Sequence, residues 1–384
     1  MEQRGGIMFA IKNAHLHLGT GEVIENGSFL VKDGTFQQVN QVKDVDCQVF
    51  DVKGQTITPG LIDVHTHLGV FEDRVGEAGH DFNETSSPIT PHIRAIDGIN
   101  PNDTAFMDAR KGGVTTVQIM PGSANVIGGE MLVVKTYGNI VDKMAIRTLS
   151  GLKAATGENP RKVYGSKGKM PTTRMGVAAL LRKKLIEGQN YLKKLDEGKA
   201  ERDIELEVIV KVLKREIPLR IHAHRSEDIA TALRIKKEFN LDMTIEHCTE
   251  GDMIADYIAE HDVAVSIGPT MSSRSKIELS NMGWHTLPIL EAAGVPVSIT
   301  TDHPVVPIEH LMTSAIYAVK DGPFSESSAL QAITLNAAKH LGVEDKVGSI
   351  ESGKDADFVI WDGDPFDLRT DVVATYIEGK VVYE

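Results

Sequence analysis

Cysteine is almost absent from this chain: Cys47 and Cys248 are the only two among 384 residues. Two cysteines cannot build the disulfide framework of a small secreted domain, so a reducing cytoplasm is the expected compartment. Cys248 directly follows His247, and its most economical role is that of a small buried apolar residue rather than a thiol ligand.

Long apolar runs and excess positive charge are also missing. No stretch of 18 or more apolar residues occurs, so no membrane-spanning helix is predicted, and residues 1–10 lack the apolar core of a signal peptide. The net charge of -13 argues against a general nucleic-acid or anionic-membrane surface. A small-molecule substrate is therefore the expected partner, and the sequence leaves homo-oligomerisation open.

The order of predicted elements indicates two domains. Residues 8–53 read as short strands with glycine turns, and β-type runs return after a helical stretch at 327–341. Between them, apolar runs alternate with helical stretches. The runs fall at 61–67, 114–119, 131–135, 145–149, 219–223, 243–247, 263–267 and 295–301; the helical stretches include 102–111, 175–196, 203–216, 227–239 and 251–260.

Eight strand–helix units predict an α/β fold with a (β/α)₈ TIM-type barrel over residues 56–342. Residues 1–55 and 343–384 would then form one composite β-sandwich domain, with the barrel inserted between its two halves.

Five polar residues stand at the ends of predicted barrel strands. His65 and His67 are two apart on an apolar strand, so their imidazoles should lie on one face. His222, His247 and Asp302 end the fifth, sixth and eighth runs. Strand C-termini form the active-site face of such a barrel, and imidazole suits zinc and related ions. An isolated His-x-His is usually an ordinary pair, but this set predicts one or two divalent cations, most simply Zn.

Three segments carry a family resemblance: residues 59–67, 334–338 and 348–359. On these the chain resembles the amidohydrolase superfamily, in its imidazolonepropionase/prolidase-like branch, over nearly its whole length. The resemblance implies a metal-dependent hydrolase of amide-type carbon–nitrogen bonds. It implies metal binding by His65, His67, His222 and Asp302, with His247 as a second-metal ligand or an oxyanion contact.

A bridging ligand after strand 4 is the first point of uncertainty. Many superfamily members use a carboxylated lysine there, and some use a glutamate. Lys153, Glu158 and Glu130 are the candidates in this sequence. Glu158 is favoured, because residues 158–160 resemble the Glu-Gly-Pro ligand motif of the sugar deacetylase branch.

A second departure concerns position 225. Deaminases and imidazolonepropionase carry a glutamate three residues after the strand-5 histidine, whereas this chain has Arg225, which stays protonated and cannot shuttle a proton. The segment 222–225 looks more like prolidase-type members. Hydrolysis of a dipeptide, an N-acyl amino acid or a cyclic amide is thus favoured over a deaminase or imidazolonepropionase-like reaction, with a non-catalytic metal-binding scaffold as a further alternative.

Roles for the remaining polar residues follow. Asp302 would move the proton between water and the leaving nitrogen, and His247 or His303 would steady the oxyanion. His303 could equally support Asp302 from behind. His224 is expected to face the barrel wall unless the chain turns there. Arg225, with the basic stretch 161–174 at the barrel mouth, would bind a substrate carboxylate.

Overall fold

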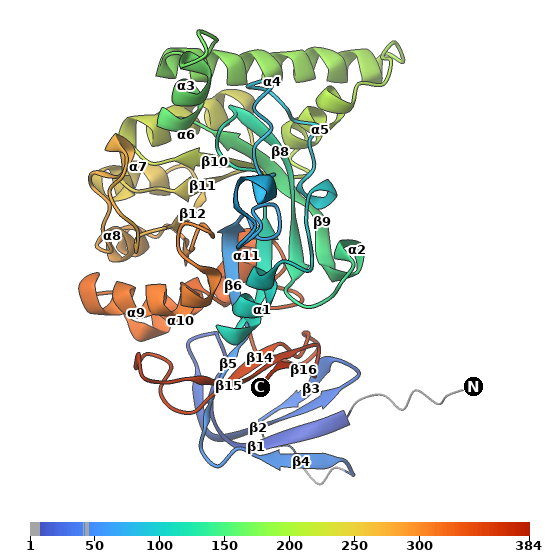
Figure 1. The fold of residues 1–384 in the computed structure, drawn as a ribbon, viewed down its shortest axis with the longest axis vertical. Coiled ribbons are helices and arrows are strands. Elements are labelled where there is room, and N and C mark those ends of the chain that lie inside the picture. Colours follow the sequence, from blue (N-terminus) through green and yellow to red (C-terminus); the bar gives the residue numbers. More distant parts are fainter. Residues whose placement is uncertain (1–7, 41, 43–45) are drawn as a thin grey trace.

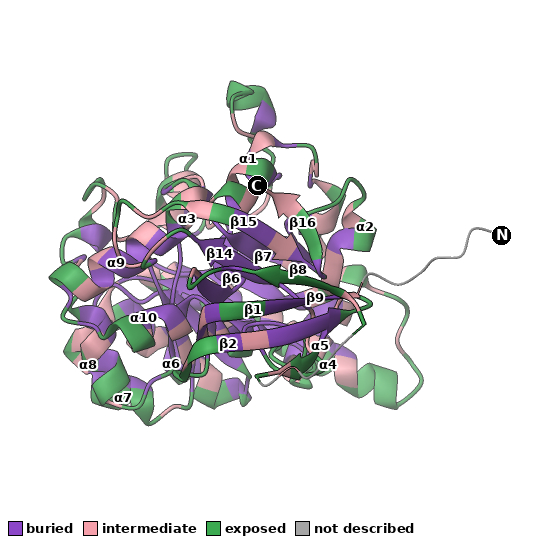
Figure 2. Ribbon diagram, turned by 90° about the horizontal axis from the view of Figure 1, so that it is seen from below, coloured by how far each residue is buried: buried purple, intermediate pink, exposed green. Residues whose placement is uncertain are grey.

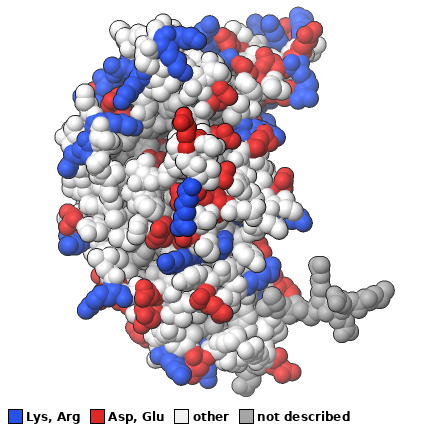
Figure 3. Space-filling view, in the orientation of Figure 1, with Lys and Arg blue, Asp and Glu red and all other residues white. Residues whose placement is uncertain are grey.

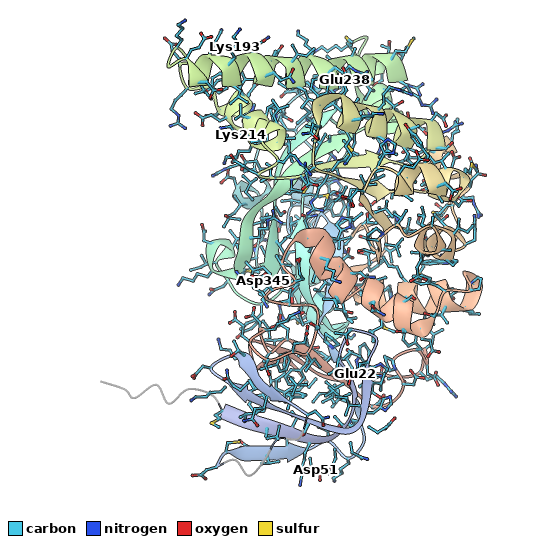
Figure 4. The ribbon with its side chains drawn as sticks, turned by 180° about the vertical axis from the view of Figure 1, so that it is seen from behind. Glu22, Asp51, Lys193, Lys214, Glu238 and Asp345 are labelled. Atoms are coloured by element: carbon cyan, nitrogen blue, oxygen red, sulfur yellow. The ribbon has the colours of Figure 1, made fainter. Side chains whose placement is uncertain are left out.

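The computed structural model describes residues 8–40, 42 and 46–384, and it contains two eight-stranded sheets. Figure 1 shows them at opposite ends of the long axis, the barrel above and the smaller sheet below. Figure 4 marks these extremes with Lys193 on the barrel side and Asp51 on the sheet side. None of the described helices is long and apolar enough to cross a membrane.

Both terminal parts of the described chain contribute to the smaller sheet. Its strands are β1 (Met8–His17), β2 (Val23–Lys32), β3 (Thr35–Val39), β4 (Gln48–Asp51), β5 (Thr56–Pro59), β14 (Phe358–Trp361), β15 (Val372–Ile377) and β16 (Lys380–Tyr383). The order is β16-β15-β14-β5-β1-β2-β3, and β4 also pairs with β1. Because β5 pairs with both β1 and β14, the smaller sheet extends to Pro59, four residues beyond the predicted boundary at residue 55.

The smaller sheet is strongly curled. Phe29 on β2 and Phe358 on β14 have ring centroids 5.0 Å apart. In a flat sheet those strands, with β1 and β5 between them, would be about 14 Å apart. The sheet therefore folds over a core of its own, in which Phe29, Phe36 and Phe358 are fully buried.

The larger sheet is the predicted barrel. Its strands follow one another in chain order: β6 (Leu61–Thr66), β7 (Val114–Ile119), β8 (Ile127–Lys135), β9 (Ala145–Ala155), β10 (Leu219–Ala223), β11 (Met243–His247), β12 (Ala264–Ile267) and β13 (Val297–Ile299). A parallel bridge between Thr66 and His303 brings the first strand beside the segment after the last. The α/β TIM-type fold is thereby confirmed.

One barrel strand runs against the others. β8 is antiparallel to both β7 and β9, whereas the remaining neighbours are parallel. The prediction of eight parallel strand–helix units was wrong here. The link 120–126 is shorter than the dozen or so residues that a crossover between parallel strands needs. The third and fourth strands also extend beyond the predicted 131–135 and 145–149.

Helices cover the outside of the barrel. They are α1 (Thr104–Lys111), α2 (Val141–Met144), α3 (Glu158–Gly165), α4 (Arg174–Asp196), α5 (Ile204–Leu213), α6 (Ser226–Phe239), α7 (Ala255–Ala259), α8 (Thr286–Ala292), α9 (Leu311–Asp321), α10 (Glu326–Ala332) and α11 (Leu335–Leu341). Figure 2 shows buried residues on the barrel strands and exposed ones on the outer helices. The predicted helix 327–341 is two helices, α10 and α11.

Buried polar contacts join the two sheets. Lys135, the last residue of β8, lies 2.5 Å from Asp357 and 2.9 Å from Asp355. Burial alone would lower the pKa of Lys135, but the two carboxylates outweigh it and raise that pKa. Because breaking a buried pair leaves an unpaired charge, this contact fixes the barrel on the smaller sheet.

Candidate functional site

The five residues predicted at strand ends meet at one end of the barrel. His65 lies on β6 and His67 follows it, His222 lies on β10, His247 ends β11, and Asp302 follows β13. Their ligand atoms fall into two groups that could each hold a metal ion: His65, His67 and Asp302, and His222, His224 and His247. Within each group those atoms lie within 4.8 Å of one another. The ring centroids of His65 and His247 are 4.6 Å apart, so the groups adjoin.

In the first group both imidazoles are held from behind. His67 Nδ1 donates to the Met120 carbonyl at 2.8 Å, and His65 Nδ1 donates to Glu246 Oε2 at 3.2 Å. In each ring this leaves Nε2 as the lone-pair nitrogen, and both Nε2 atoms face Asp302 Oδ1, at 3.4 Å from His65 and 3.3 Å from His67. Two imidazoles and a carboxylate therefore converge on one point. Both imidazoles are the tautomer that leaves Nε2 unprotonated, as metal binding requires.

Glu246 supports His65 from a buried polar network. Its side chain is fully buried and accepts hydrogen bonds from Thr244 and Ser266, and His340 Nε2 lies 3.3 Å from Oε1. Burial would raise the pKa of Glu246, but His340 and His65 outweigh it and hold that pKa well below its usual range. The ionised carboxylate can therefore orient His65. The sequence analysis missed this residue, although a glutamate within an apolar strand is itself a signal of a buried, paired charge.

Asp63 ties the first and last barrel strands together. Its carboxylate accepts hydrogen bonds from the hydroxyls of Thr300 and Thr301 and from the backbone N–H of Thr301 and His65. Burial raises the pKa of Asp63 to about 6. Asp302 itself has a φ of 52°, a left-handed conformation that non-glycine residues rarely adopt, and these contacts at residues 300 and 301 hold the backbone beside it.

In the second group three imidazoles pack together. The rings of His224 and His247 stack with centroids 4.5 Å apart, and His222 lies 4.6 Å from His224 and 4.5 Å from His247. His247 Nδ1 donates to the Gly268 carbonyl, and His224 Nδ1 lies 2.7 Å from the Thr249 hydroxyl. Neither ring nitrogen of His222 has a hydrogen-bond partner among the described residues.

His224 corrects the prediction that it faces the barrel wall. Residues two apart on an extended chain share a face, the rule that places His65 beside His67. His224 follows the last residue of β10, and its ring stays on the side of His222. The chain therefore presents two His-x-His pairs, one at the end of β6 and one at the end of β10.

Glu278 joins the second group from a distant part of the chain. It lies in the short 3-10 helix Ile277–Leu279, is 2% exposed, and places Oε1 3.5 Å from His222 Nε2 and 3.8 Å from His224 Nε2. Burial would raise the pKa of Glu278, but His222 and His224 outweigh it and lower that pKa. No local sequence pattern marked this glutamate.

Lys153, rather than Glu158, lies at the junction of the two groups. Its Nζ is 3.1 Å from His65 Nε2 and its side chain is fully buried. Burial lowers the pKa of Lys153 to about 8. Glu158 belongs to neither group of candidate ligands, and its backbone N–H donates to Glu278 Oε2 instead. Glu130 is in neither group either; Lys211 and Arg94 are its charged neighbours of opposite sign.

His303 is buried beside Asp302. Its Nδ1 accepts a hydrogen bond from the backbone N–H of Ile308, so Nε2 carries the proton. That Nε2 has no hydrogen-bond partner among the described residues, and Asp73 Oδ1 lies 4.0 Å from it. Burial lowers the pKa of His303 to about 4. It is therefore a neutral imidazole with a free N–H, which suits donation to a substrate oxygen.

Some of the predicted carboxylate-binding cations have partners of their own. Arg225 Nε lies 2.9 Å from Glu227, with 33% of the arginine side chain exposed. Within the basic stretch, Lys167 donates to the Thr85 carbonyl and Arg174 pairs with Asp228. Figure 3 shows Lys and Arg side chains around the end of the molecule that carries α3 and α4, interspersed with acidic ones.

A cavity of about 330 Å³ lies near the first group, lined by residues that contact its members rather than by the members themselves. Phe82, in its lining, has its ring 5.2 Å from that of His67. Gly128, also in the lining, is so close to Lys153 that an added Cβ would lie 3.4 Å from its Cγ. The rest of the lining includes His92 and Arg94 from the long segment between β6 and α1. The cavity is therefore separated from His67 by Phe82 and from Lys153 by Gly128.

Comparison with known proteins agrees with this geometry. Residues 56–382 match the model of the amidohydrolase family. An amidohydrolase structure from Thermotoga maritima superposes with a TM-score of 0.95 at 41% identity, covering 98% of this chain and 100% of that one. A prolidase complexed with N-methylphosphonate-L-proline superposes at 0.62 with 18% identity, over 98% and 100% of the two chains, and shows the shared fold.

Two curated relatives complete the comparison. Amidohydrolase tasK from Hapsidospora irregularis is 26% identical over 95% of this chain but only 40% of its own length. Imidazolonepropionase from Thermoplasma acidophilum is 23% identical over 94% of this chain and 90% of its own. The chain belongs to the amidohydrolase family. It is accordingly an enzyme, a hydrolase acting on carbon–nitrogen bonds of small molecules.

Proposed function

We propose that the protein is a divalent-metal-dependent amidohydrolase that cleaves an amide or peptide-type bond in a dipeptide, an N-acyl amino acid or a cyclic amide. One observation carries the proposal: two buried imidazoles present Nε2 atoms 3.3 and 3.4 Å from one carboxylate oxygen, with both Nδ1 atoms engaged behind. Neutral imidazole and carboxylate are the ligands of catalytic zinc. His65, His67 and Asp302 would hold the first cation.

A bound divalent cation supplies Lewis acidity, which polarises a carbonyl and makes water easier to deprotonate. Asp302 takes the proton from water and delivers it to the leaving nitrogen. Burial would raise the pKa of Asp302, but His67 and His65 outweigh it and lower that pKa to about 2, so the carboxylate is ionised. His303, with its free Nε2–H, donates to the carbonyl oxygen as negative charge develops there.

Lys153 would join the two halves of the site. It lies near the end of strand 4 (β9), close to where many superfamily members carry a carboxylated lysine, and its charge acts on the pKa values of His65, His222, His247 and Asp302. Addition of carbon dioxide to the neutral amine, with loss of one proton, gives a carboxylate with two oxygens. We propose that this group, in place of Glu158, would contribute a ligand between the two groups of histidines, and that His247 would be a further ligand.

The test is a substrate screen on metal-loaded and chelator-treated protein, using dipeptides, N-acyl amino acids and cyclic amides. Hydrolysis by the loaded protein that disappears on chelation and returns with metal supports the proposal. Hydrolysis unaffected by chelation, in protein shown by elemental analysis to be metal-free, excludes it. A cytoplasmic location and a homo-oligomer stay predictions from the sequence.

Ring hydrolysis of the imidazolone type is the second candidate. The imidazolonepropionase of Thermoplasma acidophilum matches over about nine-tenths of both chains, which favours a cyclic substrate. Arg225 still stands where that enzyme class carries a glutamate. A cyclic imidazolone included in the screen separates the two candidates: turnover of it alone selects ring hydrolysis, and turnover of linear amides alone selects the first candidate.

A further inference from the structure

We infer that His222, His224 and Glu278 form a second cation site that repeats the donor set of His65, His67 and Asp302. Each site would include a His-x-His pair at the end of a barrel strand and one carboxylate from another segment. This inference rests on the proposed metal-dependent function and assigns ligands to its second ion. His224 and Glu278 are the residues it adds.

The distances in the two triplets agree. An ion about 2.1 Å from each of its ligands in tetrahedral geometry separates neighbouring ligand atoms by about 3.4 Å. Asp302 Oδ1 lies 3.4 and 3.3 Å from its two Nε2 atoms. Glu278 Oε1 lies 3.5 and 3.8 Å from the Nε2 atoms of His222 and His224. The second triplet is thus slightly wider than the first and within reach of one ion.

Unsatisfied polar atoms mark the second triplet. Glu278 Oε1 and both ring nitrogens of His222 have no hydrogen-bond partner among the described residues, and both side chains are at least 97% buried. Leaving a buried polar group unpaired costs about 1–3 kcal/mol, more for a charged one. Two of these atoms, His222 Nε2 and Glu278 Oε1, face each other at 3.5 Å beside His224 Nε2, and they indicate a site that an ion completes.

The surrounding chain holds Glu278 in this orientation. The backbone N–H of Glu158 donates to Oε2 at 3.0 Å, which leaves Oε1 free to face the histidines. Gly157, with a φ of 76°, makes room for the carboxylate, because a Cβ at that position would lie 2.8 Å from Oε2. Both the turn conformation and the close approach at residue 157 therefore require glycine.

Lys276 makes a loose ion pair with the carboxylate. Lys276 Nζ lies 3.8 Å from Glu278 Oε1, beyond hydrogen-bond distance, and donates instead to Asn159 Oδ1 at 2.8 Å. Glu278 Oε1 therefore lies as far from Lys276 Nζ as from His224 Nε2, and closer to His222 Nε2, at 3.5 Å. Two neutral imidazoles do not neutralise a buried carboxylate, whereas a divalent cation does.

The experiment is a metal titration without substrate. Chelator-stripped protein is loaded with Zn²⁺ or Co²⁺, freed of excess metal by gel filtration, and its metal content measured by elemental analysis. The wild type should bind two equivalents. Glu278→Gln and His224→Ala should each weaken one of them by at least about tenfold, and the visible absorbance of the cobalt form should change. His67→Ala should instead weaken the other ion.

Glu250→Gln is the matched control. Glu250 is also a buried glutamate, but both of its oxygens accept hydrogen bonds, from Ser226 and Asn281, so its variant should keep two ions. Thermal unfolding identifies variants that fail to fold. Two ions of unchanged affinity in folded Glu278→Gln and His224→Ala would overturn the inference while leaving the metal-dependent hydrolase in place. A wild type that binds no metal would overturn both.

Discussion

The first half of the site (His65, His67 and Asp302) and the second half (His222, His224 and Glu278) use the same kinds of side chain but are supported differently. Around His65 and His67, every Nδ1 is engaged and the carboxylate behind His65 is itself held by three neighbours. Around His222 and Glu278, polar atoms are left unsatisfied. The first half is rigid before any ligand arrives, whereas the second depends on an occupant to satisfy it. We therefore expect the first half to set the affinity for the first cation and the second half to respond most to metal removal.

The largest effect should come from replacing His65 and His67 together by alanine. This removes both imidazoles of the first half and therefore the transition-state stabilisation that the cation supplies. We expect the rate to fall by about a thousandfold or more, which corresponds to several kcal/mol. Elemental analysis should show the loss of at least one equivalent of metal. Full metal content in this double variant would contradict the assignment of the first half.

Asp302→Asn separates binding from catalysis in the same half. The amide keeps the shape and one oxygen for a cation but cannot accept the proton. We expect the rate to fall at least about 100-fold, with a smaller loss of metal. Steady-state kinetics on the substrate found in the screen provides the measurement. Near-normal turnover would place the base elsewhere.

Glu246→Gln tests whether support from behind distinguishes the two halves. Loss of the charged acceptor behind His65 should weaken the first cation about 10- to 100-fold, as for other residues that orient a metal-bound histidine. The second ion should change far less, because no carboxylate contacts His222 Nδ1. Competition with a chelating dye measures both affinities. If both ions bind equally more weakly in the variant, the two halves are not independently supported.

The pH dependence of stability should reveal the buried histidines when metal is removed. Burial lowers the pKa of His65 to about 4 and that of His224 to about 3, from a usual value of 6.5. Between those values the unfolded chain binds protons that the folded chain excludes. The stability of stripped protein is therefore fully present above pH 6.5 and is lost as the pH falls toward 4, by about 1.4 kcal/mol per pH unit for each histidine. Denaturant titrations of stripped protein at pH 7.5 and 5 measure it; equal stability at both would contradict the assignment.

The smallest effect is expected outside both halves, at Arg225. The arginine is paired with Glu227, so a substrate carboxylate would have to compete for it. Arg225→Met should reduce the preference for a free acid over its C-terminal amide by about tenfold, the value of one charge-assisted hydrogen bond. If the variant keeps the full preference, Arg225 does not bind the carboxylate.

The sequence predicted what depends on local pattern. Strand ends located His65, His67, His222, His247 and Asp302, because side-chain alternation and barrel topology determine where those residues point. It could not predict Glu278, which reaches His222 from a loop 56 residues later along the chain. It could not orient β8, since an apolar run looks the same in either direction. Glu158 was favoured by motif, but the register of β9 places Lys153 beside His65.

One feature of the smaller sheet bears on how the chain is made. β5 pairs with β14, about 300 residues later. At about 5–20 residues per second, the ribosome delivers the partner strand roughly 15–60 s after β5 emerges. During that time the edge of β5 is open to other chains. A nascent chain that stops before β14 already carries every proposed ligand, yet it lacks the strand that covers this edge. Correct folding therefore depends on a stretch that is translated after the whole site and contributes no ligand to it.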